Sequence, residues 1–255
     1  MGSRTLEITL KDFVRAIGNS KFKRQIILKG GLNLEVALIK YNSPINARPT
    51  VDADFQLFSE DILESLLAEI PHLESQLNLK YKVFDRRGLD KTPNSDSITI
   101  ETDLGVKFEV DINISKYKVD VEVFDIEYPL GYSMESMLAD KLKVFYSKKI
   151  YRRSKDLYDL YLLSVAKNFK LIATKSVILD KWENTVFPEM PLHSANLDDL
   201  KYAYNKLSGI GDKLEFEEIY KKVFEFTTPL IGFIFSKAAD DLQWDANKRE
   251  WVECG

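Results

Sequence analysis

Apolar and polar residues alternate with a period of two in two segments of the chain. In residues 50–58 the apolar positions 51, 53, 55 and 57 alternate with polar positions, and in residues 106–114 the apolar positions are 106, 108, 110, 112 and 114. Successive side chains of a strand point to opposite faces, so each segment is predicted to be a strand with one apolar and one polar face. The polar faces carry Thr50, Asp52 and Asp54 in the first strand, and Glu109 and Asp111 in the second.

The remaining pattern predicts further strands and a series of helices. Strands are predicted at 79–84 and 98–102, and in the apolar run that leads from Gln25 to two glycines. Helices are predicted at 8–19, 32–41, 59–77, 133–149, 154–167, 172–184, 196–207 and 215–226. Ser59 is a candidate cap of the third helix and Pro71 a kink within it. We therefore expect an α+β fold, with a mixed sheet and flanking helices in residues 1–130 and an all-α helical domain in residues 131–255.

Two glycines, Gly30 and Gly31, join the first short strand to its helix. This order exposes backbone N–H groups at the helix start, where anions bind readily. An ordinary strand–turn–helix corner has the same appearance. The strand that bears two aspartates follows this helix, and the order of these elements makes the anion site worth considering.

The paired acids suit a metal ion. Asp52 and Asp54 share one strand face, and hard oxygen ligands held close together suit Mg2+ (or Mn2+), which takes other ligands from water and substrate phosphates. If the two acidic strands pair with their apolar faces together, a third acid joins them. We favour Asp111 over Glu109, because it lies near the middle of its strand and has the shorter side chain. Three acids can hold two divalent ions about 3.5–4 Å apart for an in-line phosphoryl displacement. A solvated strand face is the plain alternative.

Composition sets the outer limits of function. The chain has 255 residues, 45% hydrophobic and 30% charged, and contains no run of 18 apolar residues, so we expect a soluble cytoplasmic protein without a membrane segment. One cysteine excludes an internal disulfide, and His72 and His193 stand far apart without cysteine partners, which argues against a zinc site. The net charge of −4 excludes a generally basic nucleic-acid coat.

Basic residues nevertheless concentrate between the two helices predicted at 133–149 and 154–167. The cluster contains Lys141, Lys143, Lys148, Lys149, Arg152, Arg153 and Lys155, with Tyr146 and Tyr151 between them. Clustered cations with interleaved aromatic residues are typical of phosphate-backbone binding. A solvated helix end is the alternative.

The joint order of these motifs resembles the AbiEii/AbiGii group of nucleotidyltransferase toxins, within the polymerase-beta-like nucleotidyltransferase superfamily. The resemblance covers residues 10–165. It lies in Lys29-Gly-Gly31, the segment from Arg48 to Asp54, the later acidic strand, Met137-Leu-Ala-Asp-Lys141 and the segment from Ser154 to Leu160. It implies a nucleotidyltransferase-like mixed sheet and metal-dependent transfer of a nucleotide from an NTP to an acceptor, with RNA (tRNA) as the expected acceptor. It also implies a cognate antitoxin.

The resemblance assigns roles to individual residues. Gly30 and Gly31 match a turn near the triphosphate, Asp52 and Asp54 match a metal-binding pair, and Thr50 matches a small hydroxyl residue before that pair. Lys141 matches a phosphate-contacting lysine, and Asp156 and Asp159 match the two acids of an Arg-Asp-x-x-Asp segment. Asp111 is expected either to complete the metal site or to deprotonate the acceptor. Two residues depart from the family pattern. Leu32 stands where Ser or Thr is usual, and Lys155 replaces an arginine, which keeps the charge but loses bidentate geometry.

Two alternatives to a nucleotidyltransferase that acts on RNA remain open at this point. The acceptor is either RNA or a small molecule such as an antibiotic, and the basic cluster favours RNA because a small acceptor does not need it. A noncatalytic nucleotide- or RNA-binding protein is the third possibility, which Leu32 favours.

Overall fold

The computed structural model describes residues 3–89, 94–116, 119–146, 149–182, 197–211, 213–235 and 242–254. Its internal contacts divide the chain into two compact units. Unit 1 consists of Met1–Lys40 and Pro49–Ser133, and unit 2 of Tyr41–Arg48 and Met134–Gly255. Unit 2 thus begins at Met134 rather than at residue 131, and it includes a short segment from the region expected to form the first domain.

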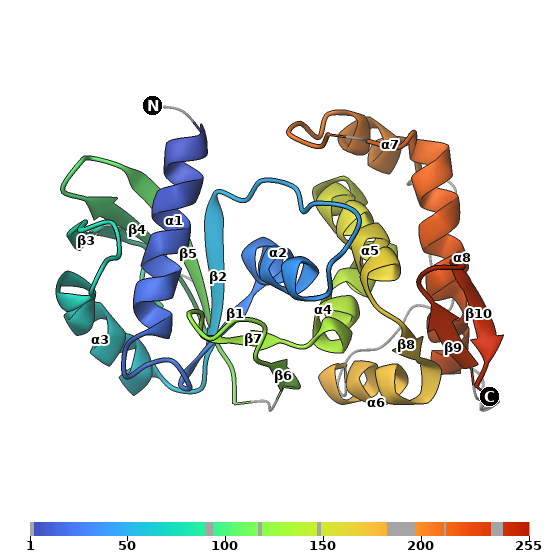
Figure 1. Cartoon of the computed structure of the whole chain (residues 1–255), viewed down its shortest axis with the longest axis horizontal. Helices are drawn as coiled ribbons and strands as arrows, with labels where there is room; N and C mark the ends of the chain where they lie inside the picture. Colours follow the sequence, from blue (N-terminus) through green and yellow to red (C-terminus); the bar gives the residue numbers. More distant parts are fainter. Residues whose placement is uncertain are drawn as a thin grey trace. The chain divides into compact units, whose positions relative to one another are not determined.

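Unit 1 is built on a mixed seven-stranded sheet with the order β3-β4-β5-β2-β1-β7-β6 (Figure 1). β2 pairs in parallel with β5 and antiparallel with β1, while β1 pairs in parallel with β7. The predicted pairing of the two acidic strands is therefore confirmed. The strands are β1 (Ile26–Lys29), β2 (Asp52–Leu57), β3 (Tyr81–Arg86), β4 (Ser95–Thr102), β5 (Lys107–Ile114), β6 (Val121–Glu122) and β7 (Leu130–Tyr132).

One face of this sheet forms the core of unit 1. The apolar residues of β2, β4 and β5 are buried there together with residues of α1 (Ser3–Gly18) and α3 (Glu60–Glu69). Ser59 caps α3 by accepting a hydrogen bond from the backbone N–H of Ile62, and a 3-10 turn (Ile70–His72) carries Pro71, as predicted. The alternation in β5 places Phe108, Val110 and Ile112 in the core, so its polar residues occupy the opposite face.

The strict alternation predicted for residues 50–58 is wrong at three positions. Val51 lies before the strand and is 48% exposed, whereas Thr50 and Gln56, expected on the polar face, are buried. Gln56 is satisfied because Tyr132 in β7 donates a hydrogen bond to its Oε1. Strands β6 and β7 were not predicted, because such short strands carry too little pattern to recognise.

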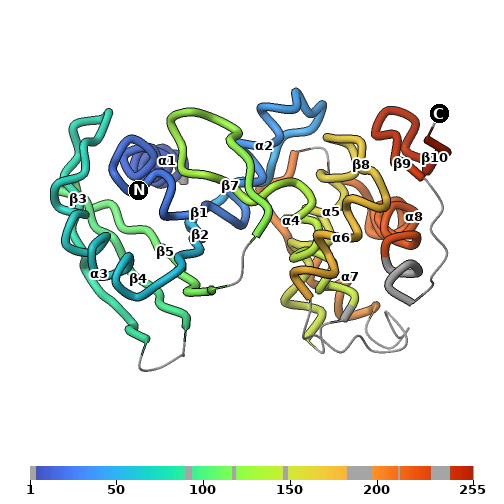
Figure 2. Tube along the Cα trace, turned by 90° about the horizontal axis from the view of Figure 1, so that it is seen from below, coloured from blue at the N-terminus to red at the C-terminus, as the bar shows by residue number. Residues whose placement is uncertain are grey.

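Unit 2 is mainly helical. Its helices are α4 (Met134–Lys141), α5 (Ser154–Ala166), α6 (Leu171–Lys181), α7 (Leu197–Asn205) and α8 (Phe216–Phe235), and α8 lies beside α5 and α6 (Figure 2). The single helix predicted at 133–149 is wrong, since α4 ends at Lys141 and is followed by 3-10 turns η2 (Leu142–Tyr146) and η3 (Ile150–Arg153). The apolar residues at helical spacing in this segment, Met134, Met137, Leu138, Leu142 and Phe145, are buried.

The second half is not all-α. A small antiparallel sheet in unit 2 has the order β10-β9-β8, formed by β8 (Phe169–Lys170), β9 (Leu242–Asp245) and β10 (Glu250–Glu253). Two tryptophans fix it to the helices: the indole of Trp244 donates to the carbonyl of Ser164 in α5 (2.6 Å), and that of Trp251 to Phe226 in α8 (3.0 Å). Aromatic packing rather than alternation specifies these strands.

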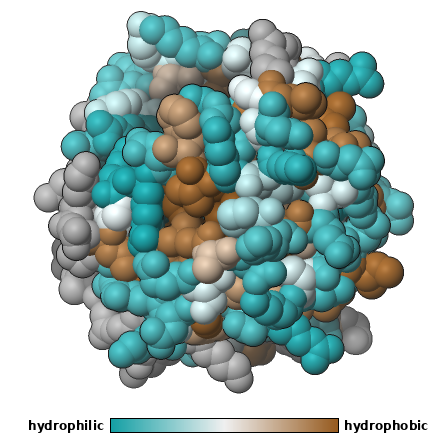
Figure 3. Space-filling view, turned by 90° about the vertical axis from the view of Figure 1, so that its left-hand side faces the viewer, coloured by the Kyte–Doolittle hydropathy of each residue, from teal (hydrophilic) through white to brown (hydrophobic). Residues whose placement is uncertain are grey.

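No helix in the described segments is both long and apolar enough to cross a membrane. On the side of β3 and α3, hydrophilic residues predominate over the surface, and apolar residues gather near the centre of the view (Figure 3). Pro188, Pro191 and His193 lie outside the described residues.

Candidate active site

The register of β2 and β5 brings four carboxylates onto one face of the sheet. Asp54 is paired with Asp111, and Asp52 with Glu109. Residues paired across two strands point to the same side, here the side opposite the apolar core. The three acids predicted to act together, Asp52, Asp54 and Asp111, are therefore assembled in unit 1 by strand pairing alone.

The start of α2 (Gly30–Lys40) lies against Asp54. Gly30 has a φ of +72°, and a Cβ placed on it would stand 1.9 Å from Oδ2 of Asp54. Two independent reasons thus require glycine at position 30: a left-handed backbone and the space that a carboxylate occupies. The first N–H groups of a helix have no partner within the helix, and its N-terminus favours negative charge. The glycine turn at the start of α2 and the aspartate pair therefore lie side by side, in one site.

Thr50 orients the first aspartate. Its side chain is buried, and its hydroxyl lies 3.0 Å from Oδ1 of Asp52, to which it donates, and 3.2 Å from the Asp52 carbonyl. Thr50 was predicted to bind the nucleotide because of its position before the pair. In the structure its hydroxyl is used within the protein, where it fixes the rotamer of Asp52.

Glu109 and Asp111 differ in how they are held. Thr99 and Ser97 of β4 donate hydrogen bonds to the carboxylate of Glu109, at 2.9 Å and 3.4 Å. The side chain of Asp111 makes no hydrogen bond or ion pair to any residue that the structure describes, although it stands directly beside Asp54. Asp111 thus has ligand positions to offer, whereas part of the capacity of Glu109 is already used.

These acids line an open pocket of about 450 Å³ that extends from β2 across β5 to β4 and the end of β3. Its lining residues are Val51, Asp52, Asp85, Arg87, Ser97, Thr99, Glu109 and Asp111. Arg87 is exposed and is the single cation among these lining residues. In the sequence, Arg87 stands out only as part of a basic turn, because the alternation of β3 and β4 carries no signal that their ends meet the acidic strands.

Lys29 is a second residue that the sequence left without a role. It ends β1 directly opposite Asp54 and immediately before Gly30. Paired residues share a sheet face, so its ammonium belongs to the acidic face. The signal was its place in the Lys-Gly-Gly sequence, which had been considered for its glycines alone.

The donor set suits a hard divalent cation. Carboxylate oxygens from two neighbouring strands are the ligands that Mg2+ uses together with water and substrate phosphates. No group of three or more His, Cys, Asp or Glu side chains in the described part of the chain is already gathered at metal-binding distances. Like charges repel one another. The chemistry of the site therefore fits the ion, and the carboxylates must draw together to bind it.

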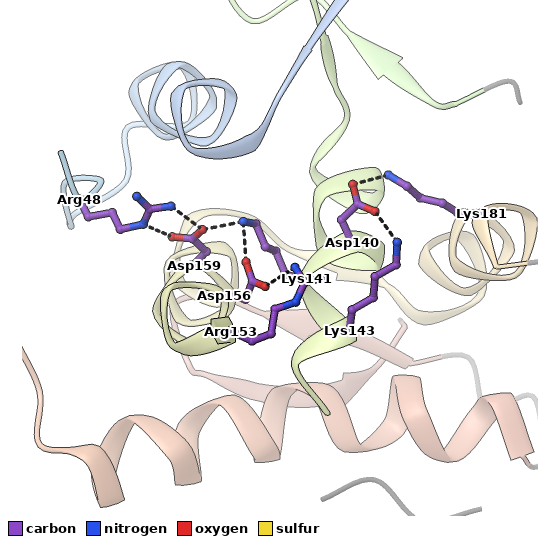
Figure 4. A network of polar contacts seen from close by, with 8 residues as sticks. All are labelled: Arg48, Asp140, Lys141, Lys143, Arg153, Asp156, Asp159 and Lys181. Carbon is purple, nitrogen blue, oxygen red and sulfur yellow. Dashed lines mark hydrogen bonds and ion pairs between the residues drawn. The ribbon is translucent and has the colours of Figure 1, made fainter. Parts of the chain in front are cut away.

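Lys141 and Asp156 meet in unit 2, inside a buried ion-pair network (Figure 4). The ammonium of Lys141 lies 2.8 Å from Asp156 and 2.8 Å from Asp159. Asp159, which is fully buried, also accepts hydrogen bonds from Arg48, at 3.2 Å and 3.4 Å, and Asp156 accepts one from Arg153 at 3.0 Å. The lysine predicted to contact phosphate is thus engaged by two carboxylates of α5.

The charges in this network stabilise each other. Burial works to lower the pKa of Lys141, but Asp159 and Asp156 outweigh it, so the pKa lies above its ordinary value. Burial works to raise the pKa of Asp159, but Lys141 and Arg48 hold it below its usual value. Both groups are charged at neutral pH for this reason.

Pairing within unit 2 reduces the basic cluster between residues 141 and 155. Lys141 and Arg153 bind Asp156, and Lys143 pairs with Asp140 at 3.4 Å. Lys149, Arg152 and Lys155 are exposed, while Lys148 lies outside the described residues. Serine is typical of helix N-caps and stands at the start of the helix predicted at 154–167, but Ser154 is already helical, and Arg153 occupies the cap position without a side-chain bond.

Comparisons with known proteins identify the family of the chain and its fold. A family model described as "Nucleotidyl transferase AbiEii toxin, Type IV TA system" matches residues 12–246. MenT4, a nucleotidyltransferase toxin from Mycobacterium tuberculosis H37Rv, is similar in structure, with a TM-score of 0.60 and 14% identity over 97% of this chain and 87% of that chain. JHP933 from Helicobacter pylori has a TM-score of 0.49 and 16% identity, over 91% and 97% of the two chains. No curated protein matches in sequence. The likeness to MenT4 confirms the α+β fold class.

Proposed function

The chain belongs to the AbiEii family of nucleotidyltransferase toxins of type IV toxin–antitoxin systems, and from this premise we propose that it transfers a nucleotide from an NTP to an RNA acceptor, with Mg2+ or Mn2+. The observation that carries the proposal is the contact between Asp54 and Gly30, with Asp111 beside it. A helix start that suits phosphate and a set of carboxylate oxygens that suits a cation share one place.

The site residues of unit 1 each have a role in this proposal. Asp52 and Asp54 hold the divalent ions, and Thr50 keeps Asp52 in its rotamer. Backbone N–H groups at Gly30 and Gly31 bind the phosphates, and this contact does not need a side-chain hydroxyl at position 32, where Leu32 is fully buried. The bound ions supply neutralisation of the triphosphate charge. Asp111 either completes their ligand set or accepts the proton of the attacking hydroxyl.

For unit 2, we propose that Lys141 and Asp156 support catalysis through the buried ion-pair network to which they belong. A lysine with a raised pKa stays protonated and carries a fixed positive charge, which is what a phosphate requires. The family implies a cognate antitoxin as a genetic partner.

The decisive experiment incubates the purified protein with each labelled NTP, total RNA and Mg2+ or Mn2+, followed by a denaturing gel. The proposal expects one NTP to label a discrete RNA band, and EDTA to abolish the label. Label on a small molecule in place of RNA supports the antibiotic-type acceptor, and no turnover of any NTP with either metal supports the noncatalytic alternative.

Gly30→Ala is expected to reduce transfer by about a hundredfold or more, because its Cβ collides with Asp54 and a small misplacement of a reacting group has this effect. The left-handed backbone adds a stability cost of about 1–2 kcal/mol. Gly105→Ala is the matched control: Gly105 has a φ of +75°, but a Cβ placed on it would have no other atom within 4 Å. It should lose similar stability and keep its activity. Equal transfer rates of the two variants would separate Gly30 from the site.

Asp111→Ala is expected to reduce transfer by about 10²–10⁴-fold if Asp111 acts as the base. Glu109 lies two residues before Asp111 on the same face of β5. Glu109→Ala should reduce the transfer rate far less, because Glu109 already accepts two hydrogen bonds. Single-turnover rates at saturating NTP measure both. A larger loss at Glu109 reverses the assignment of the third acid.

A further inference from the structure

A second pocket lies within unit 2, between η3 and α7. It has a volume of about 520 Å³ and is lined by Tyr151, Ser154, Asp199, Tyr202, Ala203, Lys206 and Leu207. Asp199, Tyr202, Ala203 and Lys206 follow one another at helical spacing, so a single side of α7 and its end forms one wall. The opposite side of α7 carries Leu200 and Tyr204, which are buried. The helix is thus anchored by one side and presents the other to the pocket.

The two tyrosine rings at this pocket are unusually accessible. Tyr151 is 45% exposed and Tyr202 is 63% exposed, although tyrosine usually buries its ring and leaves only its hydroxyl in water. Cations accompany both rings. The ammonium of Lys206 donates a hydrogen bond to the hydroxyl of Tyr202 and lies 4.0 Å from the centre of that ring. The guanidinium of Arg152 lies 5.8 Å from the centre of the Tyr151 ring. Neither ring has a place in the ion-pair network of Lys141.

Exposed aromatic rings flanked by cations fit a flat, partly apolar ligand that is attached to phosphate. A nucleobase stacks on an aromatic face irrespective of its identity, and basic side chains bind the adjoining backbone. Asp199 and Ser154 offer an acceptor and a hydroxyl to the polar edge of such a base. Ala203 and Leu207 supply apolar wall.

We propose that this pocket, the Tyr151–Tyr202 pocket, binds an unstacked base of a single-stranded RNA. The proposal deepens the proposed function and rests on it where it treats that RNA as the acceptor. Lys206 is the single cation among the lining residues, so the pocket itself offers no cradle for a triphosphate. Arg152 in η3 and Lys155 at the start of α5 are exposed nearby in sequence, where a polynucleotide backbone can pass.

The test measures RNA affinity without NTP, by anisotropy of a short fluorescein-labelled single-stranded RNA. The variant Tyr151→Leu/Tyr202→Leu keeps apolar bulk and removes both rings, and we expect its affinity to fall about tenfold per ring. Tyr151→Phe/Tyr202→Phe keeps the rings and should bind like the wild type. Phe224→Leu removes an aromatic side chain of equal exposure (45%) on α8, away from the lining residues, and should have no effect.

Several results would overturn the proposal. These are unchanged affinity of the leucine pair, an equal loss for the phenylalanine pair, an equal loss for duplex RNA, or no binding of single-stranded RNA by the wild type. Thermal unfolding of each variant shows whether a loss of affinity reflects a loss of folding. Asp52→Asn serves as the separate control for catalysis, because it removes transfer and leaves this binding unchanged. If the wild-type protein binds single-stranded RNA through these rings but transfers no nucleotide, that result contradicts the proposed function and not the pocket.

Discussion

Asp54→Asn and Asp52→Asn are each expected to abolish nucleotide transfer while the protein remains folded. Each change removes a charged metal ligand and with it several kcal/mol of transition-state charge stabilisation, a loss of about a thousandfold or more in rate. Asp54 also lies against the start of α2, so its neutralisation should cost about 0.3–1 kcal/mol of stability. Transfer rates over an Mg2+ titration, together with thermal unfolding, measure both effects.

Asp85→Asn is the matched control for these variants. Asp85 lines the same pocket as Asp52, but it stands on β3 and accepts a hydrogen bond from the backbone N–H of Arg86 at 2.9 Å. It should retain transfer and respond to Mg2+ like the wild type. Near-normal transfer by Asp52→Asn or Asp54→Asn would remove that residue from the metal site, and a collapse of folding would show that its charge is structural.

Lys141→Met should lower the free energy of unfolding by about 3–5 kcal/mol, because it leaves Asp156 and Asp159 buried beside a missing partner. Lys143→Met is its control on the adjoining turn. Lys143 pairs with Asp140 while 46% of its side chain is exposed, and such surface pairs contribute about 0–1 kcal/mol. Urea unfolding of both variants tests the difference. Equal stabilities would show that Lys141 is free to serve phosphate alone.

The same network sets limits on pH. Asp159 has a lowered pKa, so its contribution to stability is complete above the ordinary value of 3.8 and is lost as the pH falls through the lowered value. Lys141 has a raised pKa, so its contribution is complete below the ordinary value of 10.5 and is lost as the pH rises through the raised value. The stability of Lys141→Met should no longer fall with rising alkaline pH as that of the wild type does.

The acidic face could be predicted from the sequence because the apolar–polar alternation of two strands specifies it. Once residues 52–57 and 107–114 are strands with apolar faces together, Asp52, Asp54 and Asp111 share a side by geometry. The contact between Asp54 and Gly30 was not predictable in the same way. It depends on the antiparallel register of β1 and β2, which no local pattern encodes.

The helical half was harder to predict for a different reason. Periodicity identified an apolar stripe from Met134 to Phe145 but did not indicate that α4 would end at Lys141. The burial of Asp156 and Asp159 was also missed, since charged residues on a helix are normally solvated. Their partners, Lys141 and Arg48, are distant in sequence, and only the folded chain brings the four together.

The segment Tyr41–Arg48 constrains how this protein can be divided or recombined. It leaves unit 1 after α2, joins unit 2, where Arg48 binds Asp159, and returns directly to the strand that bears Asp52 and Asp54. A fragment cut after Ser133 would keep all seven strands but carry an arginine that has lost its carboxylate. A chimaera that exchanges residues 134–255 between relatives must therefore exchange 41–48 with them. The unit that must be exchanged as a whole is therefore discontinuous in sequence. We expect insertions and deletions in residues 41–48 to be selected against as strictly as changes in a core helix.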